Sequence, residues 1–369
     1  MKKTIKLIIL SLLPALIFFG SAEVIVRSLS LDTPSIIAGG SGIGPNSIVQ
    51  PDSELGWVLK PNISLKKKAC SVTINSLGLR SAEVQPKKKN EFRILSLGES
   101  TTFGVGVRDN ETYSAQLQKL LNQTIKSRYI TVINAGVSAY SSFQSLKYLE
   151  LRGLKLKPDL ILFYHEVNDY LPTAVHDIEL NEIGVIKTDK QLYDSTLYKI
   201  NRFLEHNWGL YRFLAYRYAR FVINKLNRND FQNPIVDIGL PDKRIKPWFN
   251  ENKDKDDDTS RKVDPFLLGR RVSEDERREN LSQLAALCKE NNIRLIIIHP
   301  SYRDSKPHEC VLTRFCRENN VLMYDAYHSL HPEEIGDKVL FQDSWHPTAY
   351  GHKCLAAGLS RFICDTIFK

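Results

Sequence analysis

The chain has 369 residues, of which 42% are hydrophobic and 25% are charged. This length and composition suffice for one large folded domain with additions, and they exclude a chain that is disordered throughout. The formal charge of +9 would suit an anionic partner such as nucleic acid, acidic lipid or acidic glycan, and charge alone does not choose among these.

Residues 1–30 predict a membrane anchor. Three lysines precede an uncharged apolar run over residues 7–22, which Glu23 closes. Such a segment is either a cleavable export signal or a retained transmembrane helix, and a buried soluble helix is the third alternative. We favour a single-pass helix because apolar residues resume after Glu23 and the lysines would hold the amino terminus in the cytoplasm. The rest of the chain would then lie on the periplasmic or extracellular side of the inner (cytoplasmic) membrane.

The six cysteines would lie in a compartment that permits disulfides. Cys310 and Cys316 are the closest pair in sequence, and buried free thiols are an equally supported alternative. No CxxC motif occurs, and no cysteine has a histidine at zinc-finger spacing. We therefore expect neither a metal ion nor another cofactor. The six positions are Cys70, Cys288, Cys310, Cys316, Cys354 and Cys364.

Residues 31–90 are predicted to form a tether and a small preamble that contains strands. The glycine-rich stretch at 38–45 is typical of a flexible tether. Residues 55–61 and 72–75 predict short strands that are bounded by turns.

From residue 91 to residue 369, short apolar runs alternate with helical patterns. Strands alternating with helices imply a parallel sheet that is covered on both faces. We therefore predict an α/β fold, a three-layer α/β/α sandwich around a central parallel sheet. Reactive groups in such sheets collect at the carboxyl ends of the strands. The predicted strands are residues 92–97, 130–133, 160–164, 294–299 and 321–324, and the predicted helices are 113–126, 142–154, 274–290 and 308–319.

An insertion at about residues 172–270 separates the third and fourth strands of this sheet. Within residues 197–226, apolar side chains are interleaved with arginines and a lysine, a pattern typical of one or two basic amphipathic helices. Such helices could pack against the main domain, or they could form an interfacial helix or a substrate lid. Residues 251–258 are almost wholly charged and predict an exposed loop.

Ser100 follows directly on the first strand of the main domain, in the segment Gly98-Glu99-Ser100-Thr101-Thr102. A hydroxyl at this place projects from the end of the sheet, and the start of the next helix offers backbone N–H groups to a developing oxyanion. A serine at a strand-to-helix turn can also be a simple helix cap.

A second reactive segment, Asp343-Ser344-Trp345-His346-Pro347, precedes the last helix. Its spacing lets one loop present a carboxylate and an imidazole together. Asp343 would fix the tautomer of His346, whose other ring nitrogen would take the proton from Ser100. A serine hydroxyl needs such a base because it is almost entirely protonated at neutral pH. The sequence therefore predicts Ser100, Asp343 and His346 as a catalytic triad.

At these residues the chain resembles the SGNH/GDSL hydrolase family. The resemblance covers residues 92–367 apart from the insertion, and it implies a flavodoxin-like α/β/α fold. It also implies an oxyanion hole made by the backbone N–H groups of Ser100 and Gly136 and by the side-chain amide of Asn168. The matching blocks occur in order at Gly98 with Ser100, at Asn134-Ala135-Gly136, at Val167-Asn168-Asp169, and at Asp343 with His346.

The sequence departs from the family pattern in two places. Glu99 replaces the usual aspartate beside the nucleophile, and Glu166 stands where many relatives have glycine, so that His165 and Glu166 could narrow or charge the cleft. Of the remaining histidines, His299 lies at the end of the fourth strand and is a cleft candidate.

The resemblance implies a serine esterase or acylhydrolase that cleaves an oxygen ester through an acyl-serine intermediate. The substrate would be an O-acetyl group of an envelope glycan or a lipid acyl ester. An O-acyltransferase acting on a cell-surface polysaccharide and a non-catalytic envelope-binding module remain as alternatives. The expected partners are the ester substrate and the membrane, with no nucleic acid, and the oligomeric state stays open. Other catalytic motifs, namely GxSxG, Walker A, GxGxxG and HExxH, do not occur.

Overall fold

A parallel sheet forms the centre of the fold, and its five strands run in the order β6-β5-β7-β8-β9. The computed structural model describes residues 2–29, 31, 48–66, 71–170, 188–215, 217, 271–303, 305–306, 308–332 and 337–369. The strands are short and rich in branched residues, as buried parallel strands require. Their bounds are β5 (Glu91–Gly98), β6 (Tyr129–Gly136), β7 (Leu160–Tyr164), β8 (Arg294–His299) and β9 (Leu322–Asp325).

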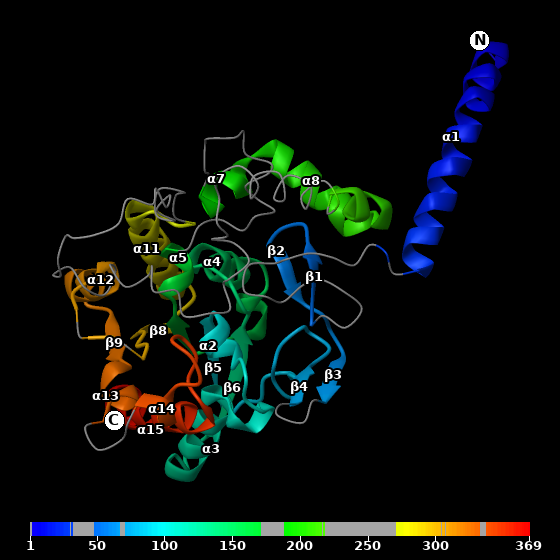
Figure 1. Cartoon of the computed structure of the whole chain (residues 1–369). Helices are drawn as coiled ribbons and strands as arrows, with labels where there is room; N and C mark the ends of the chain where they lie inside the picture. Colours follow the sequence, from blue (N-terminus) through cyan, green and yellow to red (C-terminus); the bar gives the residue numbers. More distant parts are fainter. Residues whose placement is uncertain are drawn as a thin grey trace, which may run out of the picture.

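Helices cover both faces of this sheet, which confirms the predicted three-layer α/β/α sandwich (Figure 1). Successive strand residues point to opposite faces, so Ile94 belongs to one hydrophobic core and Leu95 to the other. The helices α3 (Tyr113–Thr124) and α15 (Ala349–Ile367) cover the Ile94 face. The Leu95 face is covered by α4 (Ser142–Leu151), α11 (Glu274–Glu290) and α12 (Val311–Asn319).

Short helices and 3₁₀ turns occupy the connections. Two of these short helices follow strand ends and carry Ser100 and Asn168, the functional residues described below. The bounds are α2 (Ser100–Phe103), η1 (Asp109–Glu111), η2 (Gly153–Leu156), α5 (Val167–Tyr170), α13 (Tyr327–Leu330) and α14 (Asp337–Leu340).

Side-chain caps set where the long helices begin. Thr112 accepts a hydrogen bond from the backbone of Ala115 at the start of α3, and Thr348 accepts one from Gly351 at the start of α15. The helix predicted at 308–319 begins three residues later, because Cys310 has extended backbone angles and is the N-cap of α12. The loop before α12 is therefore longer than the sequence pattern indicates.

The preamble forms two antiparallel hairpins. The strand β1 (Val49–Asp52) pairs with β2 (Gly56–Leu59), and β3 (Ile63–Lys66) pairs with β4 (Ser71–Ile74). The sequence predicted strands near β2 and β4 and missed their partners. Side chains of the hairpins belong to the core on the Leu95 face of the sheet. The boundary predicted at residue 90 stays a prediction, and the predicted tether at 38–45 lies outside the described residues.

The amino-terminal helix α1 (Lys2–Ser28) extends away from the α/β sandwich (Figure 1). Its segment Ser11–Ser28 is long and apolar enough to cross a membrane, which a signal sequence would also be. Its carboxyl-terminal turn contacts the insertion. Glu23 accepts hydrogen bonds from the N–H groups of Gly209 (2.9 Å) and Leu210 (2.6 Å).

The insertion contributes α7 (Asp189–Asp194) and α8 (Thr196–Asn207), followed by further helical residues up to 215. The amphipathic helix predicted within 197–226 is therefore present in its first half. Residues 218–226 and the charged segment 251–258 lie outside the described residues.

Candidate active site

Ser100 stands at the sharp turn where β5 ends and α2 begins. Gly98 makes this turn possible because a Cβ at that position would lie 2.1 Å from Thr102 Oγ1 and 2.8 Å from the carbonyl oxygen of Tyr164. With no side chain at Gly98, the short helix folds back against the strand end. The Ser100 hydroxyl is thereby presented at the carboxyl edge of the sheet.

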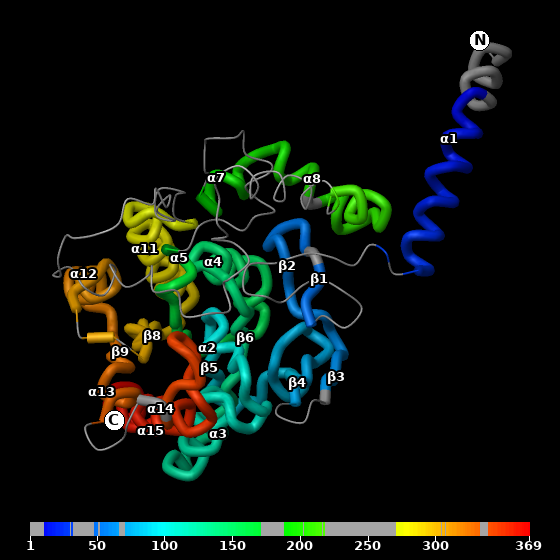
Figure 2. Tube along the Cα trace, in the orientation of Figure 1, coloured from blue at the N-terminus to red at the C-terminus, as the bar shows by residue number. Residues whose placement is uncertain are grey.

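The three predicted triad side chains form one hydrogen-bonded chain. His346 Nε2 lies 2.9 Å from Ser100 Oγ, and His346 Nδ1 lies 2.7 Å from Asp343 Oδ2. The loop that carries Asp343 and His346 reaches the start of α2 although 246 positions separate the serine from the histidine. Figure 2 shows this loop, in orange-red, beside α2 in cyan.

Hydrogen bonds from the His346 side chain and from the backbone favour the charged form of Asp343. Burial alone would raise the pKa of Asp343, but the hydrogen bond from the His346 side chain lowers it below its usual value. The N–H groups of Trp345 (2.8 Å) and His346 (2.7 Å) also donate to Asp343 Oδ1. A charged Asp343 selects the His346 tautomer with a proton on Nδ1, which leaves Nε2 free to accept a proton from Ser100.

Two of the three predicted oxyanion donors have a hydrogen that is available to bind an oxyanion. In the described residues, the Ser100 N–H has no acceptor, as is usual for the first residue of a helix. Asn168 lies in α5, at the end of the neighbouring strand β7, and its side-chain amide donates to the carbonyl oxygen of Tyr140 (3.1 Å). An amide nitrogen carries two hydrogens, so one remains for a ligand.

Gly136 has a different environment from the one that the resemblance implied. Its N–H donates to Asn134 Oδ1 at 2.9 Å, so it would have to give up this bond to serve an oxyanion. A Cβ at Gly136 would lie 2.3 Å from the backbone nitrogen of Phe103, which explains the glycine by close packing against α2. The predicted role of Gly136 as an oxyanion donor stays a prediction.

Ala139 is a candidate donor that the sequence analysis missed. It adopts a left-handed backbone conformation with φ of 64°, which non-glycine residues rarely do. Its N–H has no acceptor among the residues that the structure describes. Ala139 also precedes Tyr140, whose carbonyl oxygen binds Asn168. The sequence analysis could not identify Ala139, because an alanine gives no indication in the sequence that its φ is positive.

Glu99 connects the nucleophile to the asparagine segment. Its carboxyl group is 1% exposed and accepts hydrogen bonds from the backbone of Asn168 (3.3 Å) and the hydroxyl of Tyr302 (3.4 Å). Burial, together with the neighbouring charge of Asp169, raises the pKa of Glu99 well above its usual range. The longer side chain that replaces the usual aspartate therefore reaches across to the loop after β7 and fixes Asn168.

His165 and Glu166 are each 1% exposed, so neither lines an open cleft as the sequence analysis suggested. His165 Nε2 lies 2.7 Å from Ser145 Oγ, and burial lowers the pKa of His165 well below its usual value. Glu166 instead lies in a cluster with His299, His308 and Cys310. This cluster was missed because its residues come from three separate segments of the chain.

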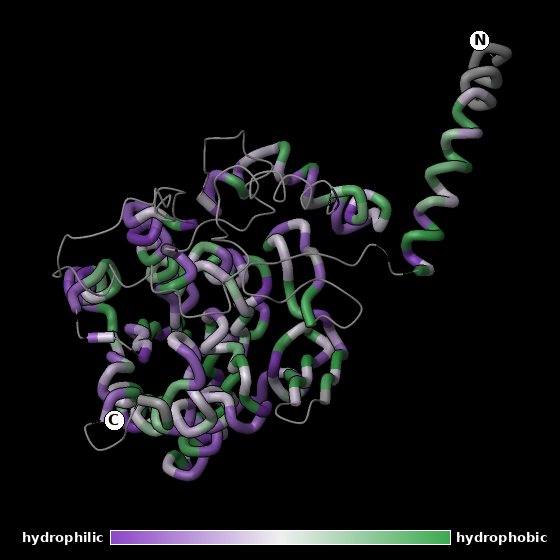
Figure 3. Tube along the Cα trace, in the orientation of Figure 1, coloured by the Kyte–Doolittle hydropathy of each residue, from purple (hydrophilic) through white to green (hydrophobic). Residues whose placement is uncertain are grey.

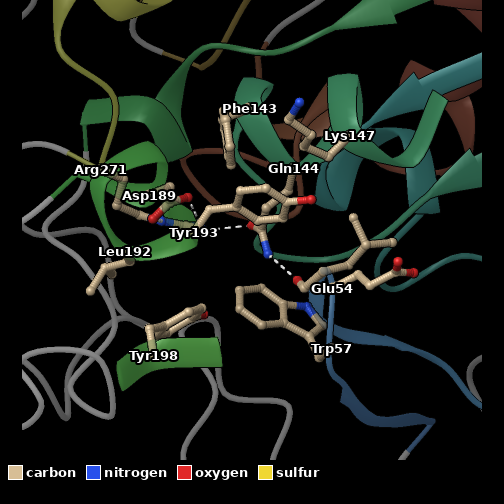
Figure 4. Close-up of a pocket in the computed structure, with 11 residues that line it drawn as sticks. Glu54, Trp57, Phe143, Gln144, Lys147, Asp189, Leu192, Tyr193, Tyr198 and Arg271 are labelled. Atoms are coloured by element: carbon tan, nitrogen blue, oxygen red, sulfur yellow. Dashed lines mark hydrogen bonds and ion pairs between the residues drawn. The ribbon is translucent and has the colours of Figure 1, made fainter. Parts of the chain in front are cut away.

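A shallow crevice lies where the preamble, α4 and the insertion meet (Figure 4). Trp57 and Tyr198 line it, and Arg271 pairs there with Asp189 at 2.8 Å. The triad residues are not among those that line the crevice. Arg271 also donates a hydrogen bond to the carbonyl oxygen of Ala139. This side chain therefore supports the loop that contains Ala139.

The five described cysteines are free thiols, which supports the second of the two alternatives for these positions. Cys70 lies outside the described residues.

Comparisons with known proteins identify the family of the chain. A profile of the GDSL-like Lipase/Acylhydrolase family matches residues 94–359, which is more than half of the chain. No curated protein matches the sequence.

Three of the solved structures that resemble this chain are described as lipases or esterases. A lipase/acylhydrolase from Enterococcus faecalis has 18% identity and a TM-score of 0.39, over 74% of this chain and 95% of that one. The esterase EstA from Pseudoalteromonas sp. has 13% identity and a TM-score of 0.41, over 75% and 99% of the two chains. A GDSL-like lipase from Bacteroides thetaiotaomicron has 13% identity and a TM-score of 0.37, over 78% and 94%. On the evidence of the profile match, the chain belongs to the GDSL-like lipase/acylhydrolase family and is an enzyme that acts on ester bonds.

Proposed function

We propose that the protein is a serine esterase that cleaves an oxygen ester through an acyl-Ser100 intermediate. The observation that carries this proposal is the unbroken hydrogen-bonded chain from Ser100 through His346 to Asp343. A hydroxyl, a base and a carboxylate in this order make up the arrangement that activates a serine nucleophile.

In the first half of the reaction, His346 Nε2 takes the proton of the Ser100 hydroxyl while Oγ attacks the ester carbonyl carbon. The carbonyl electron pair moves onto oxygen and forms the tetrahedral oxyanion. When the oxyanion collapses, the bond to the alcohol oxygen breaks and His346 gives its proton to that oxygen. Water then attacks the acyl-serine by the same route, which releases the acid and restores Ser100.

Backbone and side-chain donors stabilise the oxyanion in this proposal. The Ser100 N–H and the second amide hydrogen of Asn168 are available, and the N–H of Ala139 is a third candidate beside Gly136. Such donors act most strongly where the developing charge is shielded from water. Asn168 is 7% exposed and Ala139 is 6% exposed, which favours this role for both.

The experiment that tests the nucleophile is labelling with a fluorophosphonate probe. Ser100→Ala should abolish labelling, because no other hydroxyl in the described residues lies within hydrogen-bond distance of His346. Ser344→Ala is the matched control, since this serine is in the same loop as the triad acid and base. Labelling that persists in the Ser100 variant, or that disappears in the control, would refute the assignment.

The substrate that we propose is an O-acetyl group on an envelope glycan or an acyl ester of a lipid. Turnover of short acyl esters, long acyl esters and acetylated sugars by the purified protein separates these classes. Product analysis with a sugar acceptor present also distinguishes hydrolysis from transfer. Release of the free acid in every condition supports the esterase, and acylation of the acceptor would replace it with the transferase.

We further propose that α1 anchors the enzyme in the inner membrane with the catalytic domain outside the cytoplasm. The exposed apolar residues of α1 favour this, because a soluble protein rarely presents such a helix to water. Recovery of the chain with an intact amino terminus in the membrane pellet after an alkaline wash is expected. A soluble form that lacks residues 1–22 would instead establish a cleaved signal.

A further inference from the structure

Four side chains with metal-binding atoms meet at the carboxyl edge of β7, β8 and β9, outside the triad. They are Glu166, His299, His308 and Cys310, and one ligand atom from each lies within 4.8 Å of those of the other three. Glu166 follows β7 by two residues, His299 ends β8, and the last two residues lie just before and at the N-cap of α12. The set therefore offers one oxygen, two nitrogens and one sulfur.

The cluster contains buried polar atoms that have no hydrogen-bond partner in the described part of the chain. Both carboxylate oxygens of Glu166 are buried and accept no hydrogen bond in the described part of the chain. The nearest group with a potential positive charge is His308, whose Nε2 lies 3.7 Å from Glu166 Oε1. His299 Nε2 is also buried without a hydrogen-bond partner. A buried carboxylate without a partner destabilises a fold unless a cation or hydrogen bonds compensate it.

The cationic groups near Glu166 donate no hydrogen bond to its carboxylate in the described part of the chain. Glu99 and Asp169 add two further buried carboxyl groups, each at most 1% exposed. Arg277 is the fully buried cation beside them, and its Nε lies 3.2 Å from Asp169 Oδ2. Arg277 also donates to the hydroxyl of Tyr170 and to the carbonyl oxygen of His165. The guanidinium of Arg277 is thus engaged by groups other than Glu166.

Asp325 orients one of the histidines. Its Oδ1 lies 3.4 Å from His299 Nδ1, and the two residues are register partners at the ends of β8 and β9. A histidine that donates one ring N–H to a carboxylate presents its other nitrogen as a ligand, and this pairing accompanies most metal-bound histidines in proteins. In this case the other nitrogen, Nε2, is the buried atom without a partner.

We propose that Glu166, His299, His308 and Cys310 bind one Zn²⁺ ion in a tetrahedral site. Calcium and magnesium prefer sites made of oxygen ligands alone, and a cluster of iron and sulfur needs several thiolates, whereas zinc accepts oxygen, nitrogen and sulfur together. A thiolate, a carboxylate and two neutral imidazoles would make the zinc complex electrically neutral, which suits a buried position. Ligand atoms of such a site lie roughly 3.5 Å apart, so small side-chain movements would close the cluster.

Four protein ligands leave no open position, so the site is structural and takes no part in ester cleavage. It would fasten both ends of the segment between His299 and Cys310. This segment supports the catalytic loop, because Arg303 donates its N–H to the carbonyl oxygen of Ser344 (3.2 Å) and Tyr302 packs edge-on against Trp345 (ring centroids 5.3 Å apart). Zinc would therefore hold the loop that carries Asp343 and His346 in place.

The test uses the full-length chain in detergent, stripped of metal with a chelator and titrated with Co²⁺ and then Zn²⁺. We expect about one Co²⁺ per chain, with the near-ultraviolet absorption of a thiolate-to-cobalt bond and the visible bands of a tetrahedral ion. Zn²⁺ should displace the cobalt and raise the melting temperature. Asp325→Asn should weaken binding about 10- to 100-fold, because it removes the carboxylate that orients His299.

Matched variants make the test specific. Cys310→Ser should abolish the thiolate band and His308→Ala should reduce binding, whereas Cys354→Ser and the exposed-histidine variant His328→Ala should bind cobalt like the unmodified chain. His308 is at the surface, so its variant remains informative if Cys310→Ser does not fold. Ser100→Ala should keep the metal, which separates this proposal from that of the nucleophile. No thiolate band in the unmodified chain, or equal loss in the controls, would overturn the zinc site.

Discussion

The side-chain amide of Asn168 gives the sharpest residue-level prediction for catalysis. Asn168→Ala should lower kcat by about a hundredfold or more, because one donor to the oxyanion is lost. The variant also loses the hydrogen bond to Tyr140, so its free energy of unfolding should fall by only about 1 kcal/mol. Steady-state kinetics and denaturant unfolding measure the two effects separately. Unchanged turnover in a folded variant would exclude the oxyanion role.

From the buried His352 we predict a pH dependence of the free energy of unfolding that is independent of catalysis. This histidine is fully buried in α15, accepts a hydrogen bond from the N–H of Tyr113 (3.2 Å), and burial lowers its pKa to about 3. The folded state thus holds His352 neutral, while the unfolded chain binds a proton near pH 6.5. Its contribution is complete above that pH and is lost as the pH falls toward 3, at roughly 1.4 kcal/mol per pH unit.

The measurement is the free energy of unfolding as a function of pH in the unmodified chain and in His352→Gln. Glutamine keeps an acceptor for Tyr113 and does not titrate, so the variant should lose stability less steeply between pH 6.5 and 3. Other buried groups titrate in both proteins, and the difference between the two curves isolates His352. Parallel curves would show that folding does not shift the pKa of His352.

Individual site residues differ in how far the sequence can identify them. Ser100, Asp343 and His346 lie beside recognisable strand and helix boundaries, so their types and places indicated a triad before any geometry was known. The Glu166 cluster was not predictable in this way, because a contact between β7, β8 and the loop before α12 depends on strand order. His308 and Cys310 are two positions apart, a spacing that carries little information without the position of His299.

Among the elements, the preamble is held to the active site by Arg80. This side chain donates hydrogen bonds to the carbonyl oxygens of Gly104 (2.5 Å), Phe103 (3.0 Å) and Val107 (2.7 Å), which follow or end α2. It also pairs with Asp109 at 2.9 Å. The loop behind the nucleophile is thereby fixed by a residue that precedes the main domain in sequence.

Arg80→Met should therefore destabilise the fold by about 3 kcal/mol or more, since three buried carbonyl groups lose a donor. Urea unfolding measures the change. Arg108→Met is the control because Arg108 is exposed in the same region, and it should change stability by about 0.5 kcal/mol or less. Equal stability of both variants would mean that the preamble does not brace α2.

Long periodic elements were easier to predict than short ones. The helix at 274–290 and the strands at 160–164 and 294–299 have the predicted bounds, because a Ser273 cap sets the start of the helix and the apolar runs of the two strands are mostly buried. The strands β1 and β3 are four residues long and include proline or lysine, so their own composition does not favour strands. They form because a hairpin partner supplies hydrogen bonds, which a pattern confined to one segment does not contain.

At the scale of the whole molecule, the carboxyl-terminal end of α1, the proposed membrane helix, contacts the insertion. Arg27 donates to the carbonyl oxygen of Asn207 (2.6 Å), which joins the end of α1 to the end of α8. The helix α8 presents an apolar face to solvent, with Leu197 62%, Ile200 51% and Phe203 59% exposed. Figure 3 shows hydrophobic residues along both helices. An exposed apolar stripe beside a membrane helix is typical of a helix that lies at the lipid interface.

Trp208, which follows α8 and is 59% exposed, reports on this arrangement. In vesicles, lipids that carry bromine on their acyl chains should quench part of the tryptophan fluorescence of the full-length chain. Trp208→Phe should remove most of that quenching, whereas Trp345→Phe, in the catalytic loop, should leave it in place. Replacing Phe203 and Ile200 by serine should reduce the quenching of Trp208 without releasing the protein, because α1, the proposed anchor, is unchanged. Quenching that is unaffected by Trp208→Phe would place α8 away from the lipid.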